Sequence, residues 1–124
     1  MIYIIVTLLY IVSFGQEKKQ IQNNYLIGKT FDYTVDNLHL NLQILFNNQI
    51  KCTYVSALNN ETGKTAIEIC TIKKISKSIY QIFWAAKDGS NVEDIFNIKT
   101  KEVFVNFTLP DAKMYNYQVI FKII

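Results

Sequence analysis

Apolar and polar side chains alternate along much of this chain with a period of two. Two runs on either side of Asp36-Asn37 show the pattern most clearly. A period of two is typical of half-buried antiparallel strands. A turn at Asp36-Asn37 puts the apolar side chains of both runs on one face of a hairpin, which we expect to face the core. These side chains are Phe31, Tyr33 and Val35, then Leu38, Leu40, Leu42, Ile44 and Phe46.

Similar runs, separated by turn-forming residues, continue to the end of the chain, and helical periodicity is nearly absent. The predicted strands span residues 30–35, 38–46, 49–58, 65–75, 78–86, 91–98, 102–109 and 114–124. Eight strands joined in simple order by short loops predict an all-β fold, an eight-stranded antiparallel up-and-down barrel that forms one domain. The interior of such a barrel, its lumen, is filled by side chains or holds one small ligand.

The N-terminal segment differs from the rest. Residues 2–14 are uncharged and almost wholly apolar, and polarity begins at Gln16. This segment is too short to span a hydrocarbon core of about 30 Å, but its length suits a secretory signal. We therefore predict a signal peptide over 1–15, a polar leader over 16–27 that covers one barrel end, and a barrel domain over 28–124. The protein would be secreted or periplasmic, with no membrane span after cleavage; an uncleaved N-terminal anchor is the alternative.

The charge pattern bears on possible partners. The chain has 124 residues and a formal charge of +3, its thirteen basic residues are all Lys, and ten acidic residues are interspersed with them. Nucleic-acid recognition relies on the flat guanidinium of Arg. Because Arg is absent and no basic block exists, a nucleic-acid partner is disfavoured.

The two cysteines suggest a disulfide. A hairpin centred on Glu61 places Cys52 opposite Cys70, where a disulfide needs modest adjustment and would stabilise the fold by about 3 kcal/mol. The alternative is two buried free thiols, and both remain open. A metal site is not expected, because two Cys and the lone His39 fall short of four ligands.

The same face pattern predicts which side chains line the lumen. A tight turn at Asp88-Gly89 places Trp84 opposite Glu93, with Ile95 and Asn97 following on the inner face. Polar groups among apolar walls orient a ligand, and a desolvated carboxyl has a raised pKa suited to acid–base work. In the alternative, Glu68 faces solvent and the aromatic residues only pack the core. The ligand-binding candidates are Tyr33, Tyr54, Glu68, Tyr80, Trp84 and Glu93.

The order of several short motifs resembles one family. They are Gly28-Lys29-Thr30-Phe31, Tyr33, Asp36-Asn37, Tyr80-Gln81-Ile82-Phe83-Trp84, Asp88-Gly89 and Thr108-Leu109-Pro110-Asp111. In this order they resemble MoaF-like domains and the related phenolic acid decarboxylases, both calycin (lipocalin-like) barrels.

The resemblance implies a barrel fold. It also allows the functional residues of the decarboxylases to be compared with the matching positions of this chain. Those enzymes use a Tyr-x-Tyr pair, an Arg and a Glu two residues after the Trp. In this chain Tyr33 matches the first tyrosine, but Val35 and Ala86 stand at the second tyrosine and the glutamate, and Arg is absent. The resemblance therefore favours a MoaF-like domain without the decarboxylase residues, and no catalytic set is recognised.

Three functions are compatible with these observations. The first is a barrel that binds a small, mainly apolar molecule in its lumen without a cofactor. The second is a lyase-like enzyme that uses Tyr33, Tyr54 and Glu68 or Glu93 for acid–base chemistry. The third is a protein-interaction module that uses an exposed strand or the loop at 59–64; it predicts a filled lumen and an exposed apolar patch.

Overall fold

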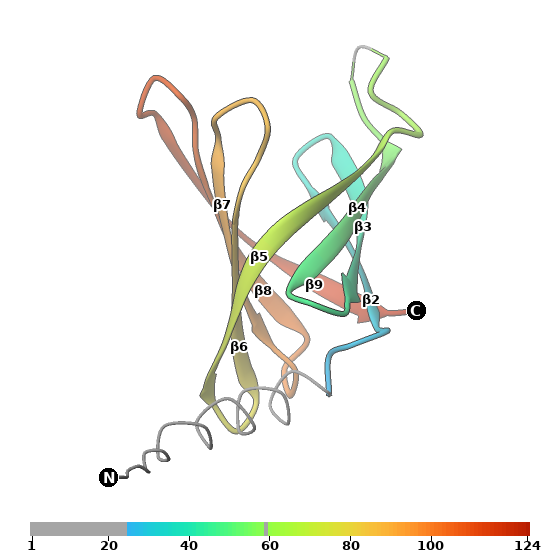
Figure 1. Ribbon diagram of the computed structural model, residues 1–124, viewed down its shortest axis with the longest axis vertical. Coiled ribbons are helices and arrows are strands. Elements are labelled where there is room, and N and C mark those ends of the chain that lie inside the picture. The colour runs from blue at the N-terminus through green and yellow to red at the C-terminus, as the bar shows by residue number, and fades with distance from the viewer. Residues whose placement is uncertain (1–24, 59) are drawn as a thin grey trace, which may run out of the picture.

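The computed structural model describes residues 25–58 and 60–124, and they form a closed barrel of eight antiparallel strands (Figure 1). The predicted all-β barrel is confirmed, and the predicted strand ends agree within two residues. The strands are β2 (Thr30–Val35), β3 (Leu38–Leu45), β4 (Gln49–Ser56), β5 (Thr65–Ser76), β6 (Ile79–Ala85), β7 (Asn91–Asn97), β8 (Glu102–Thr108) and β9 (Met114–Ile123).

Strand order follows chain order, and pairing of β2 with β9 closes the barrel. In that closing pair Phe31 lies opposite Ile123 and Tyr33 opposite Phe121. The β2–β3 hairpin has the predicted two-residue turn, since Val35 pairs with Leu38. Within the described part of the chain, no helix has the length and apolar character needed to cross a membrane.

Strand β5 divides the wall of the barrel. Its first half, through Ile69, pairs with β4, whereas its second half, from Cys70, pairs with β6. The first half of β5 and the end of β6 therefore separate toward the end of the barrel that carries the β4–β5 and β6–β7 loops. This end, uppermost in Figure 1, is called the upper end below.

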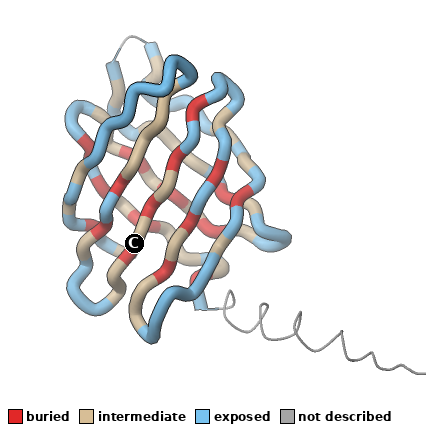
Figure 2. The backbone as a smooth tube through the Cα atoms, turned by 90° about the vertical axis from the view of Figure 1, so that its left-hand side faces the viewer, coloured by how far each residue is buried: buried red, intermediate tan, exposed pale blue. Residues whose placement is uncertain are grey.

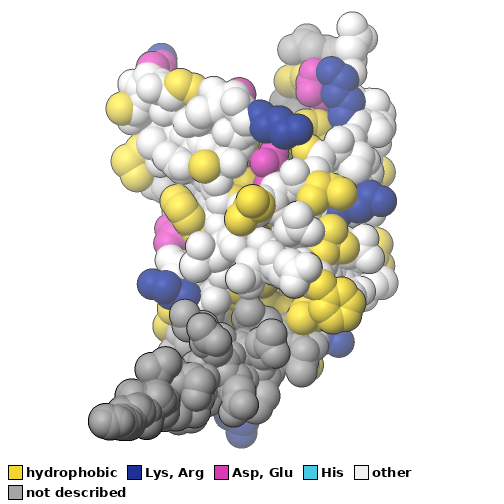
Figure 3. Space-filling model, viewed as in Figure 1, with side chains coloured by type: hydrophobic (Ala, Val, Ile, Leu, Met, Phe, Trp, Pro, Cys, Tyr) yellow, Lys and Arg dark blue, Asp and Glu magenta, His cyan; other side chains and the backbone are white. Residues whose placement is uncertain are grey.

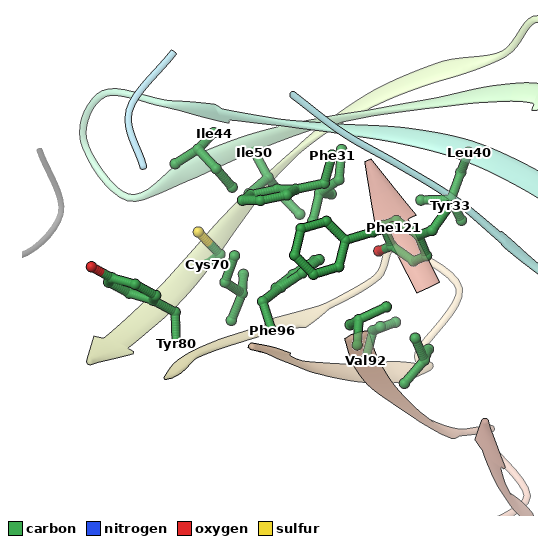
Figure 4. Close-up of a cluster of buried hydrophobic side chains, with 14 of the residues drawn as sticks. Phe31, Tyr33, Leu40, Ile44, Ile50, Cys70, Tyr80, Val92, Phe96 and Phe121 are labelled. Carbon is green, nitrogen blue, oxygen red and sulfur yellow. The ribbon is translucent and has the colours of Figure 1, made fainter. Parts of the chain in front are cut away.

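An aromatic cluster fills the interior at mid-height. The rings of Phe31 and Phe96 stack at 4.4 Å between centroids, and Phe121 meets them edge-on at 5.3 and 5.2 Å. Figure 4 shows these rings converging from β2, β7 and β9. Buried positions alternate with exposed ones along the strands (Figure 2), as a one-sided core requires.

The lower end is closed by residues that precede β2. Leu26 is fully buried, and the Gly28 amide donates to the Ile44 carbonyl at 2.8 Å. Of the predicted leader (16–27), only residues 25–27 are described, so the prediction for the segment as a whole is not tested. The predicted signal peptide (1–15) lies outside the described residues.

Phe46 is placed wrongly by the strand pattern. Strand β3 ends at Leu45, and Phe46 begins the turn that contains Asn47 and Asn48. Both Asn residues have left-handed backbone angles, φ 61° and 56°, which Asn tolerates well. Phe46 therefore projects into solvent, 70% exposed.

The predicted register between β4 and β5 is also wrong. Cys52 pairs with Ala66, and the Cys70 amide donates to the carbonyl of Asn48, four positions before Cys52. In the β4–β5 loop, the Tyr54 carbonyl accepts a hydrogen bond from the Gly63 amide at 2.6 Å. Tyr54 therefore pairs closer to Gly63 than a hairpin centred on Glu61 requires. The two thiols do not lie opposite each other, and both are free.

The register of β7 differs from the prediction by one residue. Ala86 N donates to Ser90 O at 2.8 Å, and Gly89 N donates to Ala86 O at 3.0 Å. The loop therefore contains three residues, 87–89, with Gly89 at φ 93°, a common hairpin form. A shift of one residue reverses every side chain of a strand.

As a result, Trp84 lies opposite Val92, and Glu93 lies opposite Phe83. The predicted inward positions Glu93, Ile95 and Asn97 are wrong. The side chains of β7 that point inward are Val92, Asp94 and Phe96.

Replacement of Phe96 by Ala tests the aromatic cluster. Because Phe96 is fully buried and contacts three other rings, we expect Phe96→Ala to lower the free energy of unfolding by about 3–5 kcal/mol in urea denaturation. The matched control is Phe104→Ala on β8, where the ring is 47% exposed, with an expected loss below about 1 kcal/mol. Equal losses for the two variants would contradict this packing.

Candidate functional site

The upper end of the barrel contains a cavity of about 360 Å³. Its walls are mainly apolar, with Leu40, Val92, Val105 and Phe107 among the lining side chains. In Figure 3 the surface is recessed at this end. The recess lies between the β6–β7 and β8–β9 loops on one side and the β4–β5 loop on the other. The cavity lies where β5 separates from β6, so side chains of the first half of β5 and of the β6–β7 loop both line it.

Asp94 and Tyr33 form the polar centre of the cavity wall. Asp94 is fully buried on β7, and Tyr33, on β2, is 3% exposed. The Tyr33 hydroxyl donates a hydrogen bond to Asp94 Oδ2. The second oxygen, Oδ1, is buried and has no hydrogen-bond partner within the described residues. Asp94 is among the residues that line the cavity, and one of its carboxyl oxygens is therefore an unused acceptor.

Burial changes the acid–base properties of this pair. Desolvation raises the pKa of Asp94 to about 7; the Glu93 charge also raises it, and the Tyr33 hydrogen bond opposes the rise. The pKa of Tyr33 is raised well above its usual value by burial and then by the Asp94 charge. Asp94 consequently changes charge near neutral pH, whereas Tyr33 stays a neutral donor.

The sequence-predicted residues fall into two groups. Tyr33, Tyr54, Glu68 and Trp84 all line the cavity. Tyr80 points inward but lies beyond the aromatic cluster from Tyr33 (Figure 4), where its ring stacks on Tyr25 at 6.0 Å. Tyr80 therefore belongs to the closed lower end.

Glu93 lies on the outer face of β7. Its carboxylate accepts hydrogen bonds from the side-chain amides of Gln81 and of Asn106, the latter at 2.9 Å. It lines a separate outer recess of about 320 Å³ with Phe83 and Asn116. This placement separates Glu93 from Tyr33, Tyr54 and Glu68.

Neither cysteine behaves as a reactive thiol. Burial raises the pKa of Cys52 to about 12, with further contributions from the Asp94 and Glu68 charges. Burial likewise raises the pKa of Cys70 to about 11. Since the thiolate is the nucleophile, Cys52 contributes to the cavity wall as a small apolar group.

Charged side chains surround the mouth of the cavity. Glu61, Glu68 and Asp88 line it together with one cation, Lys64. Lys64 Nζ lies 3.1 Å from Glu61 Oε2. The Ser90 amide donates to Asp88 Oδ1 at 2.8 Å and lowers the pKa of that carboxyl, so Asp88 is ionised at neutral pH.

Metal binding is not supported within the described residues, which contain no group of three or more His, Cys, Asp or Glu side chains able to hold an ion. His39, the lone histidine, pairs with Asp32 at 2.5 Å between Nε2 and Oδ1. Both side chains occupy the polar face of the β2–β3 hairpin, away from the lumen.

Sequence reasoning missed Asp94, the residue with the strongest claim to function. A two-residue turn at Asp88-Gly89 predicts that its neighbour Glu93 faces inward instead. The available signal was the alternative three-residue loop, in which Gly occupies the left-handed third position. With that loop, Val92, Asp94 and Phe96 become the inward set.

The comparisons with known proteins support the fold. Among solved structures, a protein from Burkholderia vietnamiensis described as a candidate beta-lactamase is similar to this chain, with a TM-score of 0.71. The two are 17% identical over 80% of this chain and 95% of the other, a similarity that shows a shared fold alone. A search of curated protein sequences found no match.

A family model gives the assignment. The model described as MoaF-like matches residues 27–122, from the residue before Gly28 almost to the end of β9. The match covers β2 to β8, β9 as far as Lys122, and every described residue that lines the cavity. The resemblance to MoaF-like domains that the motif order predicts is confirmed. The chain therefore belongs to the MoaF-like family.

Proposed function

We propose that this protein is an exported barrel that binds one small, mainly apolar molecule in its upper cavity, with residues 1–15 as the export signal. The observation that carries this proposal is the cavity itself. Its volume of about 360 Å³ falls within the range of roughly 300–1,000 Å³ typical of small-molecule sites. Apolar walls with a few polar groups are also the usual composition of such sites.

The contrast between the two halves of the barrel supports a binding role. The lower half is packed by Leu26 and the aromatic cluster, which includes Phe31 and Phe96. The upper half has comparable apolar walls but contains a cavity. Protein interiors are normally packed as densely as organic crystals, so an unfilled half is consistent with a site for a ligand.

Asp94 supports the same proposal. A buried polar atom without a partner is costly. Asp94, which lines the cavity, keeps one such oxygen among the described residues. A ligand with a hydrogen-bond donor would satisfy that oxygen. Such a polar group among apolar walls fixes the orientation of a bound molecule.

The cavity counts against the protein-interaction module. That hypothesis expects a filled lumen, and the described barrel has an open upper half. Exposed apolar side chains do occur on the outer face, such as Ile69 and Ile120 at 76% and 75%. Apolar atoms make up a large part of any protein surface, so such side chains do not by themselves indicate a partner.

A proton-transfer enzyme is the second candidate function. The specific observation is the Tyr33–Asp94 pair, since a carboxyl with a pKa of about 7 suits general acid–base catalysis at neutral pH. The decarboxylase set is not restored, because Ala86 lines the mouth and the chain has no Arg. Turnover of a bound ligand that Asp94→Asn abolishes, while binding persists, would favour this function.

Binding of an uncharged apolar dye tests the proposed function. We expect 1-aminoanthracene to bind with increased fluorescence, because the cavity walls exclude water from the ring system. Ala66→Phe places a large side chain on the cavity wall and should weaken binding by about tenfold or more. Ile69→Phe on the outward face of the same strand, where Ile69 is 76% exposed, should bind like the wild type.

Circular dichroism shows whether both variants keep the barrel. The proposal is wrong if the wild type binds neither 1-aminoanthracene nor other apolar dyes. It is also wrong if Ala66→Phe remains folded and binds as tightly as Ile69→Phe.

The pH dependence of stability tests the burial of Asp94. In the unfolded chain Asp has a pKa of about 3.9, and in the barrel Asp94 has a pKa of about 7. Between these values the folded state holds a proton that the unfolded state has released, so this residue makes the protein less stable as pH rises.

Asp94→Asn removes that titration. We compare the free energy of unfolding of the variant with that of the wild type by urea denaturation at each pH. The variant's value minus the wild-type value should rise by about 3 kcal/mol from pH 5 to pH 8. Parallel stability profiles for the two proteins would contradict the buried placement of the Asp94 carboxyl.

A further inference from the structure

We propose that the ligand of the upper cavity is an apolar amine, with its ammonium group beside Asp94 and its apolar body against Trp84 and Phe107. This inference rests on the proposed binding function and names the chemical class of the ligand. Three observations carry it: the sign of the charges that line the cavity, the pairing of its described cation, and the unpartnered oxygen of Asp94, a residue that lines the cavity.

Among the ionisable side chains that line the cavity, acidic ones outnumber basic ones. Among the described residues, four carboxyl groups line the cavity, from Glu61 and Asp88 in the loops, Glu68 on β5 and Asp94 on β7, against a single basic side chain, Lys64. A low-dielectric cleft lined by one sign of charge concentrates ligands of the opposite sign. Cations are therefore favoured and anions are disfavoured.

The one cation of the lining already has a partner. Lys64 Nζ lies 3.1 Å from Glu61 Oε2 at the exposed mouth. The chain contains no Arg, the side chain that pairs most strongly with a ligand carboxylate or phosphate. An anionic ligand would thus meet Asp94 and Glu68 without a free positive group in the lining.

Asp94 supplies the independent observation. It is fully buried, it lines the cavity, and its Oδ1 has no hydrogen-bond partner within the described residues. Tyr33 donates to the other oxygen and so holds the carboxyl in position. An ammonium group that donates to Oδ1 would satisfy the buried acceptor and form a charge-assisted hydrogen bond.

The pH response follows from the groups around Asp94. Across β6 and β8 its neighbours are the apolar Ile82 and Val105. The titratable groups nearby are Tyr33 on β2, Cys52 on β4, Glu68 on β5 and the outward Glu93 on its own strand.

Tyr33 and Cys52 stay neutral below pH 9, because burial raises the pKa of each, that of Cys52 to about 12. Asp94, with a pKa of about 7, changes charge near neutrality. An aliphatic ammonium keeps its charge over this range, as Lys does. Amine affinity should therefore rise with pH.

Three probes of matched shape test the proposal by isothermal titration calorimetry: 4-phenylbutylamine, the uncharged 4-phenyl-1-butanol and the anionic 4-phenylbutyrate. At pH 8 we expect the amine to bind about tenfold or more tightly than the alcohol, and the carboxylate to bind most weakly. Between pH 5.5 and pH 8 the amine should gain about tenfold in affinity while the alcohol changes little.

Two variants assign the effect to Asp94. Asp94→Asn should reduce the affinity for the amine to that for the alcohol and remove the pH dependence, with alcohol binding retained. Glu102→Gln makes the same change in net charge on β8, outside the cavity lining, and should leave both affinities unchanged. Retained alcohol binding by Asp94→Asn also shows that the variant keeps its cavity.

The outcomes separate the two proposals. If the alcohol binds and the amine is not preferred, or if Asp94→Asn keeps the preference, the amine inference is overturned while the binding function stands. If none of the three probes nor any apolar dye binds, both proposals are overturned.

Discussion

The hydrogen bond from Tyr33 to Asp94 determines the chemical character of the cavity. It joins β2 to β7 across the lumen, while the other carboxyl oxygen is buried and has no partner among the described residues. The register of β7 makes this contact possible. That register depends on the three-residue loop at 87–89, since one residue fewer would turn Asp94 outward and Glu93 inward.

The two ends of the barrel have different roles. At mid-height and below, Phe31, Phe96 and Phe121 pack against one another, and Leu26 closes the end. Above them, β5 separates from β6, and the wall opens into a cavity of about 360 Å³. The packed half stabilises the closed barrel, so that the upper half can keep a buried carboxyl and an unfilled space. The fold thus supports a site whose own residues are unfavourable for stability.

Much of the fold could be predicted from local pattern. Alternation indicates which face of the β2–β3 hairpin is apolar, so the strands and the inward placement of Tyr33 follow from the sequence. Alternation alone left two faces open for Trp84 and for Glu68, both of which line the cavity. Pairing between strands depends on loop geometry, which alternation does not encode. The loop at 57–64 and the loop at 87–89 therefore account for the errors at Cys52, Cys70 and Glu93. Asp94 was missed for the same reason, since its strand was reversed by one residue.

The ionisation of Asp94 tests this account most directly. With ¹³C-labelled aspartate carboxyl groups, NMR titration of the free protein should show one carboxyl, absent from Asp94→Asn, that titrates near pH 7. Addition of 4-phenylbutylamine should move that midpoint downward, because a nearby cation favours the ionised carboxyl. A midpoint for Asp94 near the ordinary value of about 3.9 would place the carboxyl in solvent and contradict the account.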